Sequence, residues 1–152
     1  MMNSKDAISG TLGTCYIETS DKRYEFAQII SLEATFEKLK AEVPILGKTG
    51  RGNKATGWKG TGSATFHYNT SIFRAMAEKF KNTGEDVYFT IQVINNDPTS
   101  SVGFQTVILK NVNFDSLILA KLDVEADYLD EDMDFTFDDF EIPTKFIDIA
   151  GM

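Results

Sequence analysis

The chain has 152 residues, 42% of them hydrophobic and 12 of them phenylalanine, which suits one compact domain and argues against a second. Its 15 Lys and Arg stand against 23 Asp and Glu, and the formal charge of -8 excludes a surface that grips nucleic acid through clustered cations. The single cysteine excludes an intrachain disulfide, and without a signal-peptide core or a membrane-length apolar run we expect cytoplasmic synthesis and no membrane insertion.

Residues 12–36 have the pattern of strands around a polar turn at 19–23, with Tyr16 before the turn. Apolar residues follow the turn: Phe26, Ile30, Leu32, Ala34 and Phe36. Residues 29–43 also fit a helix, because apolar side chains recur every three or four positions among good helix formers: Ile29, Leu32, Phe36, Leu39 and Val43. The pattern alone leaves strand and helix open for this stretch.

Residues 44–62 contain six glycines, four cations and no acidic residue. Such a glycine density disfavours regular structure, so the segment is predicted to be a long, mobile, basic loop. Loops of this length in a compact domain are usually functional or disordered.

The next stretch changes its apolar period from two to about 3.6. Gly62 opens a predicted strand in which Ala64, Phe66 and Tyr68 share one face. A helix over about 71–82 is then predicted, capped by Thr70 or Ser71 and ended near 82–84. Its apolar stripe consists of Ile72, Phe73, Met76, Ala77 and Phe80.

In the C-terminal half, apolar and polar residues alternate in several stretches, which predicts further strands. Strands are predicted at 87–94 and 105–110, joined as a hairpin through the turn at 95–98, and again at about 117–124 and 133–140. The block 113–143 holds eleven acidic residues and one base, Lys121, yet keeps a period of two, which indicates folded acidic β-structure. Six to eight strands in all fit a sandwich or a barrel.

The sequence contains parts of known phosphate-binding and metal-binding motifs, but none of these motifs is complete. Residues 47–49, Gly-Lys-Thr, match the end of a phosphate-binding loop, but Glu42 stands where its first glycine belongs. Four acids have the spacing of a calcium-binding EF-hand, namely Asp130, Asp132, Asp134 and Glu141, but Phe135 occupies the position of the turn glycine. One histidine and one cysteine do not make a zinc site. We therefore expect no enzyme, no metal and no cofactor.

The order of several motifs along most of the chain resembles the tail tube proteins of contractile phage tails and PBSX-type prophage particles. Besides the glycine-rich segment and the helix, these motifs lie at residues 8–10, 60–66, 88–90, 112–116, 122–125, 135–140 and 143. The resemblance implies a mainly β, antiparallel sandwich-like or barrel-like tail tube fold with one helix, in a single domain over residues 1–152. It also favours a long strand for residues 29–43.

Membership of this family would imply hexameric rings that stack into a hollow inner tube, in a virion tail or tail-like particle. The implied partners are other copies of the chain, the tail sheath protein, and baseplate and tail terminator proteins, while DNA passes without specific binding. The alternative is a monomeric β-sandwich or barrel that binds a small ligand, with the glycine-rich segment as a lid.

Two surfaces are candidate sites under the tail tube interpretation. Cationic and aromatic residues of the glycine-rich segment are expected to contact a neighbouring subunit or ring: Lys48, Arg51, Lys54, Trp58 and Lys59. Trp58 fits a core anchor equally well. Acids expected to form an acidic face or line the lumen are Asp123, Glu125, Asp127, Asp134 and Asp138.

Overall fold

The computed structural model describes residues 2–20, 22–25 and 29–149. The elements in chain order are η1 (Ser4–Asp6), β1 (Gly13–Glu18), β2 (Arg23–Glu25), β3 (Ile29–Val43), β4 (Gly52–His67), α1 (Ile72–Thr83), β5 (Phe89–Asn96), β6 (Phe104–Phe114), β7 (Asp130–Phe137) and β8 (Asp139–Thr144). The predictions of a mainly β chain with one helix are confirmed for the described residues. Phe26 of the predicted second strand lies outside them.

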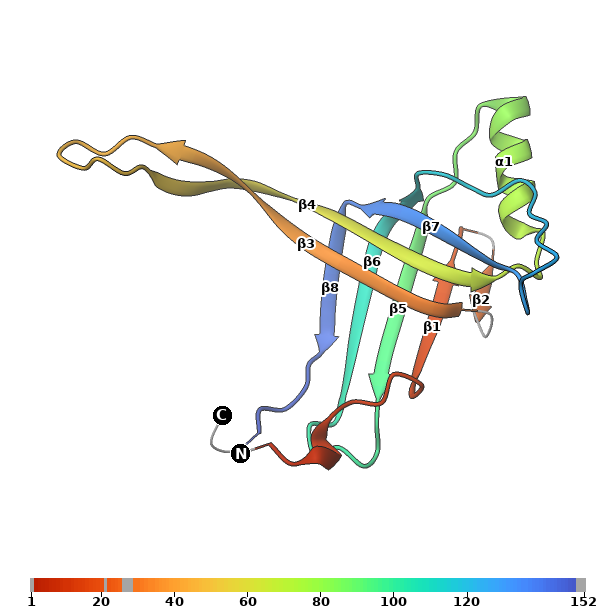
Figure 1. Ribbon diagram of the computed structural model, residues 1–152, viewed down its shortest axis with the longest axis horizontal. Coiled ribbons are helices and arrows are strands. Elements are labelled where there is room, and N and C mark those ends of the chain that lie inside the picture. The colour runs from red at the N-terminus through yellow and green to blue at the C-terminus, as the bar shows by residue number, and fades with distance from the viewer. Residues whose placement is uncertain (1, 21, 26–28, 150–152) are drawn as a thin grey trace.

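The strands form two crossing layers that share β6. Neighbouring strands follow the order β2-β1-β5-β6-β7-β4-β3, β8 pairs with β6, and every pairing is antiparallel. Figure 1 shows β3, β4 and β7 crossing in front of β1, β5, β6 and β8. The path ends at β2 and β3 without closing, so the described chain forms a sandwich-like pair of layers and not a closed barrel.

The core lies between the layers and is mostly aromatic and branched. Its fully buried members include Phe66 on β4, Phe135 on β7, Ile17 on β1 and Ile91 on β5. Each such side chain contributes roughly 1.5–3 kcal/mol through removal from water. Phe73 of α1 packs against Phe66 with ring centroids 5.1 Å apart, so the helix covers one end of this core.

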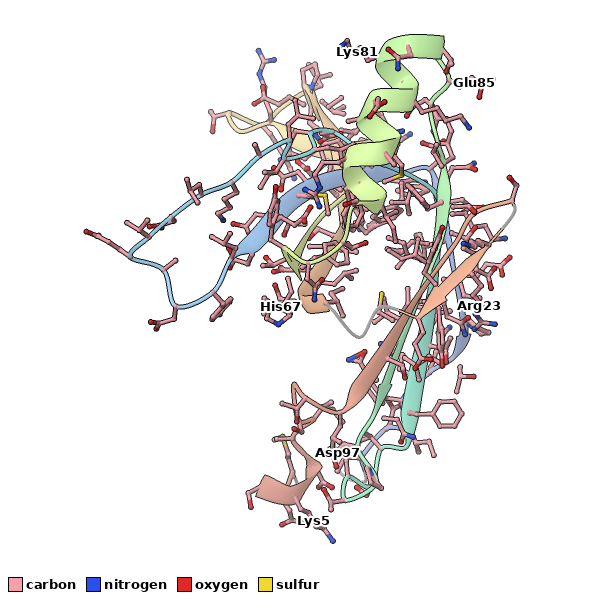
Figure 2. All side chains as sticks on the ribbon, turned by 90° about the vertical axis from the view of Figure 1, so that its right-hand side faces the viewer. Lys5, Arg23, His67, Lys81, Glu85 and Asp97 are labelled. Carbon is pink, nitrogen blue, oxygen red and sulfur yellow. The ribbon has the colours of Figure 1, made fainter. Side chains whose placement is uncertain are left out.

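The helix predicted over 71–82 is confirmed as α1, with Ser71 at its N-cap. Gly84 ends it in the left-handed conformation with φ 75°, and its N–H donates to the carbonyl of Phe80. Figure 2 shows Lys81 near this end of α1, at the far end of the molecule from Asp97. Among the described residues, no helix has the length and apolar character that crossing a membrane requires.

A buried ion pair fixes α1 to β7. Glu131 is fully buried and accepts hydrogen bonds from both terminal nitrogens of Arg74, at 2.7 and 3.3 Å. The same guanidinium donates to the carbonyls of Thr70 at 2.5 Å and Ile118 at 2.8 Å. Arg74 therefore ties the helix, its N-terminal turn and the segment after β6 to one strand of the front layer.

Two buried carboxylates fasten the N-terminal segment to the turn between β5 and β6. Asp97 accepts hydrogen bonds from the hydroxyl of Thr99 at 2.7 Å and the N–H of Ser9 at 3.0 Å. Asp6 accepts from the hydroxyl of Ser101 at 2.7 Å. These hydrogen bonds lower the pKa of both carboxyl groups below the ordinary value of 3.8, with the hydroxyl donors as the main cause.

The prediction of a loop over 44–62 is wrong for most of its length. Residues from Gly52 onward belong to β4, and only 44–51 connect it to β3, a single 15-residue strand as the family resemblance favours. A Cβ on Gly60 would lie 2.4 Å from the ring of Phe137, and one on Gly62 would lie 2.3 Å from that of Phe135. These glycines make room for aromatic rings in a sheet, and so their density does not indicate a loop.

The predicted strand at 117–124 is also wrong. Residues 115–129 are irregular, and Leu122 and Val124, which lie in the predicted strand, are 89% and 92% exposed. Lys121 donates to the carbonyl of Asp130 at 2.6 Å and to its carboxylate at 3.0 Å, which ties this segment to the start of β7. The predicted strand at 133–140 is divided between β7 and β8 at Asp138.

Candidate functional site

A hairpin arm projects from the body of the molecule. β4 pairs with β7 only over residues 60–67, so residues 37–59 continue as a two-stranded arm, with Glu37 opposite Lys59 and Val43 opposite Gly52. Seven residues of β3 at about 3.3 Å each extend this arm by roughly 23 Å. Figure 1 shows the arm as the longest extension of the molecule, directed away from α1.

The predicted contact cations all lie on this arm. Lys48 and Arg51 lie in the arm tip, residues 44–51, and Lys54 lies on β4, all of them exposed. Within the described ranges, no ion pair involves these three side chains, whereas Lys59 at the arm base lies 3.6 Å from Glu37. The tip therefore carries free positive charge, and Lys59 contributes to the arm itself.

The arm tip also exposes apolar side chains that sequence analysis did not select. Leu46 is fully exposed and Ile45 is 42% exposed. The run Pro-Ile-Leu in an otherwise polar segment is the signal that could have identified them. An exposed leucine beside cations at the end of a projecting hairpin is typical of a contact surface.

Trp58 lies at the base of the arm. Its ring stacks on Phe36 with centroids 5.0 Å apart and meets the edge of Phe140 on β8 at 5.6 Å. This cluster packs the arm against the back layer and leaves Trp58 only 36% exposed. The structure thus places Trp58 in an anchor within the chain, with one edge open to solvent.

The outward side of β3, β4 and β7 forms a second candidate surface, here called the polar face. The register aligns three rows across these strands, and their members are Thr35, Thr61 and Thr136, then Glu33, Ser63 and Asp134, then Ser31, Thr65 and Asp132. Asp132 accepts a hydrogen bond of 2.6 Å from the hydroxyl of Thr65. An open recess of about 460 Å³ lies on this face between Glu33, Asp134 and Asp115. The surface is acidic and rich in hydroxyl groups.

The five predicted acids do not share one face. Asp134 belongs to the polar face, and Asp138 lies between β7 and β8. The other three, Asp123, Glu125 and Asp127, are exposed in the irregular segment 115–129 beside α1. Sequence analysis missed Glu33, which only the strand register brings into one row with Asp134, with Ser63 between them.

The residues with EF-hand spacing lie in extended structure. Asp130, Asp132 and Asp134 alternate along β7, while Glu141 on β8 forms an ion pair of 2.7 Å with Lys110. Over the described ranges, no group of three or more His, Cys, Asp or Glu side chains is arranged to hold a metal ion.

Comparison with known proteins agrees with this architecture. The family model of the phage tail tube protein matches residues 1–144. The chain belongs to the phage tail tube protein family. It is 40% identical over 147 residues to the phage-like element PBSX protein XkdM of Bacillus subtilis (strain 168), covering 97% of each chain.

Two solved structures share this fold. A chain of the anti-feeding prophage baseplate, 6-fold symmetrised, superposes with a TM-score of 0.68 at 12% identity, covering 93% of this chain and 97% of that one. A chain of the sheath–tube complex of an extracellular contractile injection system gives 0.62 at 11% identity, with 90% of each covered. At these identities the likeness shows the fold, while the family match shows the relationship.

Proposed function

We propose that this chain, as one domain over residues 1–152, assembles into hexameric rings that stack to form the hollow inner tube of a contractile phage tail or tail-like particle. The observation that carries the proposal is the open edge of β3, a 15-residue strand at the end of the sheet order. An exposed strand edge of this length pairs readily with another chain. Pairing around a ring would close the edges of all six copies into one barrel.

The polar face is proposed to line the channel. A wall of carboxylates and hydroxyl groups repels DNA phosphates, so a genome could slide through without specific binding. Of the predicted lumen acids, Asp134 is the one that belongs to this face. Glu33 and Asp132 add two further carboxylates to it. The role is structural and not enzymatic.

The arm is proposed to contact a neighbouring subunit or ring through Lys48, Arg51 and Lys54, with Trp58 and Lys59 at its base. The other partners are the tail sheath, baseplate and terminator proteins. Support comes from fold relatives in a 6-fold symmetrised baseplate and in a sheath–tube complex. We place the assembled protein in the virion tail or tail-like particle, after synthesis in the bacterial cytoplasm.

Negative-stain electron microscopy of the purified chain at low and high concentration tests the proposal. Rings and hollow tubes of uniform width are expected, because ring stacking is a heterologous contact that propagates. Dispersed monomers at every concentration, even with baseplate components added as nuclei, would instead favour a monomeric ligand-binding sandwich.

A further inference from the structure

We propose that a groove beside α1 is the socket for the arm tip of a second copy of this chain. The inference rests on the proposed assembly into rings and tubes, and it adds the receiving surface to that assembly. The groove lies between α1 and the segments that adjoin β5 and β6.

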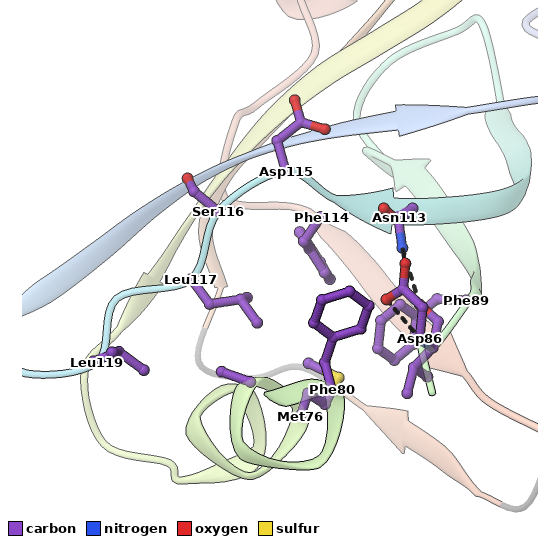
Figure 3. A pocket seen from close by; sticks show the side chains of 12 residues that line it. Met76, Phe80, Asp86, Phe89, Asn113, Phe114, Asp115, Ser116, Leu117 and Leu119 are labelled. Atoms are coloured by element: carbon purple, nitrogen blue, oxygen red, sulfur yellow. Dashed lines mark hydrogen bonds between the residues drawn. The ribbon is translucent and has the colours of Figure 1, made fainter. Parts of the chain in front are cut away.

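The groove is large and mainly apolar. Its volume is about 560 Å³, within the roughly 300–1,000 Å³ typical of binding pockets. Figure 3 shows Phe80 and Met76 on the helix side, with Phe114, Leu117 and Leu119 opposite them. Phe80 is 55% exposed and Leu119 is 69% exposed, so both keep apolar surface in water on the isolated subunit.

The rim of the groove is acidic. Asp86 and Asp115 line it, and Asp86 is held by a hydrogen bond of 2.8 Å from the side chain of Asn113 (Figure 3). The irregular segment that supplies Leu119 continues into three exposed acids, Asp123, Glu125 and Asp127. Its one base, Lys121, is already bound to Asp130. On α1, Lys79 pairs with Glu85 at 3.2 Å and Lys81 follows Phe80, so acids outnumber cations around the groove.

The arm tip has the complementary chemistry. Leu46 and Ile45 present exposed aliphatic side chains that match an apolar groove. Lys48 and Arg51 flank them, and residues 43–58 contain no acid. An apolar centre with positive neighbours fits an apolar groove with a negative rim, and such complementarity fixes the orientation of the contact.

The two surfaces belong to different copies because they lie at opposite ends of one chain. Figure 1 shows the arm tip at one end of the long axis and α1 at the other. The aromatic cluster of Phe36, Trp58 and Phe140 holds the arm base in this direction. A tip and a socket at opposite ends make a heterologous contact, which closes into a ring or propagates into a stack.

Disulfide trapping between two proteins that each carry one introduced cysteine tests the assignment. Both carry Cys15→Ala, which removes the buried thiol without placing a hydroxyl group in the core; burial raises the pKa of this thiol to about 11. One protein carries Leu46→Cys and the other Leu119→Cys. The control replaces the second with Ile147→Cys, which is 67% exposed and lies outside the groove.

Assembled mixtures are oxidised briefly with copper phenanthroline and separated by mass. We expect covalent heterodimers of the 46 and 119 proteins to form at least about tenfold faster than those of the control pair, because docking raises the local thiol concentration. Tubes that form normally while both pairs cross-link at the same rate would refute the socket and leave the tube function standing. Absence of tubes from the unsubstituted protein would instead refute the tube function.

A second variant needs no cross-link. Leu46→Ser should raise the concentration needed for assembly roughly ten- to a hundredfold, as expected for loss of one buried leucine from an interface. Ile147→Ser serves as the control, and circular dichroism of the dispersed protein checks that both variants fold. Unchanged assembly of Leu46→Ser would contradict the proposal. So would tubes of the unsubstituted protein that still bind an apolar dye in their grooves at one molecule per subunit.

Discussion

Replacing Gly62 with alanine should strongly destabilise the fold. A Cβ at this position would lie 2.3 Å from the Cζ atom of Phe135 and 2.7 Å from the carbonyl oxygen of Glu33. The ring cannot move aside freely, because Phe135 is only 1% exposed and packs at the centre of the core. The carbonyl oxygen of Glu33 belongs to the backbone of β3, which is paired with β4, so this oxygen cannot move aside freely either.

Gly57 on the same strand provides the matched control. The nearest atom to a Cβ there is a methyl carbon of Leu39 at 3.9 Å, which is ordinary contact. Overpacking a core costs about 1–3 kcal/mol. Alanine in place of an unstrained strand glycine gains about 0.5–1 kcal/mol. Both substitutions share this gain, so the free energies of unfolding of Gly62→Ala and Gly57→Ala should differ by the cost of overpacking, about 1–3 kcal/mol.

Urea unfolding of dilute, unassembled protein, followed by far-ultraviolet circular dichroism, measures this difference. With a urea dependence of about 2 kcal/mol per molar, the two midpoints should lie about 1 M apart. Midpoints within about 0.2 M of each other would refute the reasoning. The glycines of β4 would then serve chain flexibility and not ring packing.

Three further perturbations have defined outcomes. Glu131→Ala should cost about 3–5 kcal/mol in urea unfolding, because it leaves a partly buried guanidinium unpaired, whereas Glu141→Ala in an exposed pair should cost less than about 1 kcal/mol. Hydrogen bonds lower the pKa of Asp97, so its contribution to stability is complete above about pH 4 and is lost as the pH falls through the lower pKa of the folded state. In Asp97→Asn the melting temperature should therefore depend less on pH between about 2 and 5. Phe140→Ala should loosen the arm base and increase acrylamide quenching of Trp58 fluorescence.

Specific results would contradict each of these expectations. Equal costs for Glu131→Ala and Glu141→Ala would mean that the buried pair contributes no more than a surface pair. An unchanged acid profile in Asp97→Asn would assign the acid sensitivity to other carboxylates. Phe104 is exposed and distant from the arm base, and quenching that rises equally in Phe104→Ala would remove the link between Phe140 and the arm.

The helix was predictable because its determinants are local. The apolar stripe and the stop at Gly84 lie within one short segment, and the observed bounds agree closely with the expected ones, although the side chain of Ser71 makes no capping hydrogen bond. Strand alternation also predicted β4 after Gly62 and most of β5. In these segments the local pattern of apolar and polar residues is enough to predict which side chains are buried.

The two wrong segments depended on distant partners. Gly60 and Gly62 are required by rings of β7, which the composition of residues 44–62 does not reveal. The alternation at 117–124 is matched by no strand pairing among the described residues, and Leu122 and Val124 stay exposed. The polar face was equally hidden, since only the register of β3, β4 and β7 aligns Glu33 with Asp134.

Charge segregation reconciles an acidic chain with self-assembly. Each copy carries a formal charge of -8, so copies repel one another at long range, and the proposed acidic channel would add to this repulsion. The arm tip reverses the sign locally, and its cations have no ion-pair partner among the described residues. Tip-to-groove contact would then be attractive only in the orientation that brings the arm to the acidic end of the next copy. Electrostatic attraction would thus select the direction of assembly, while burial of Leu46 would stabilise the contact between tip and groove.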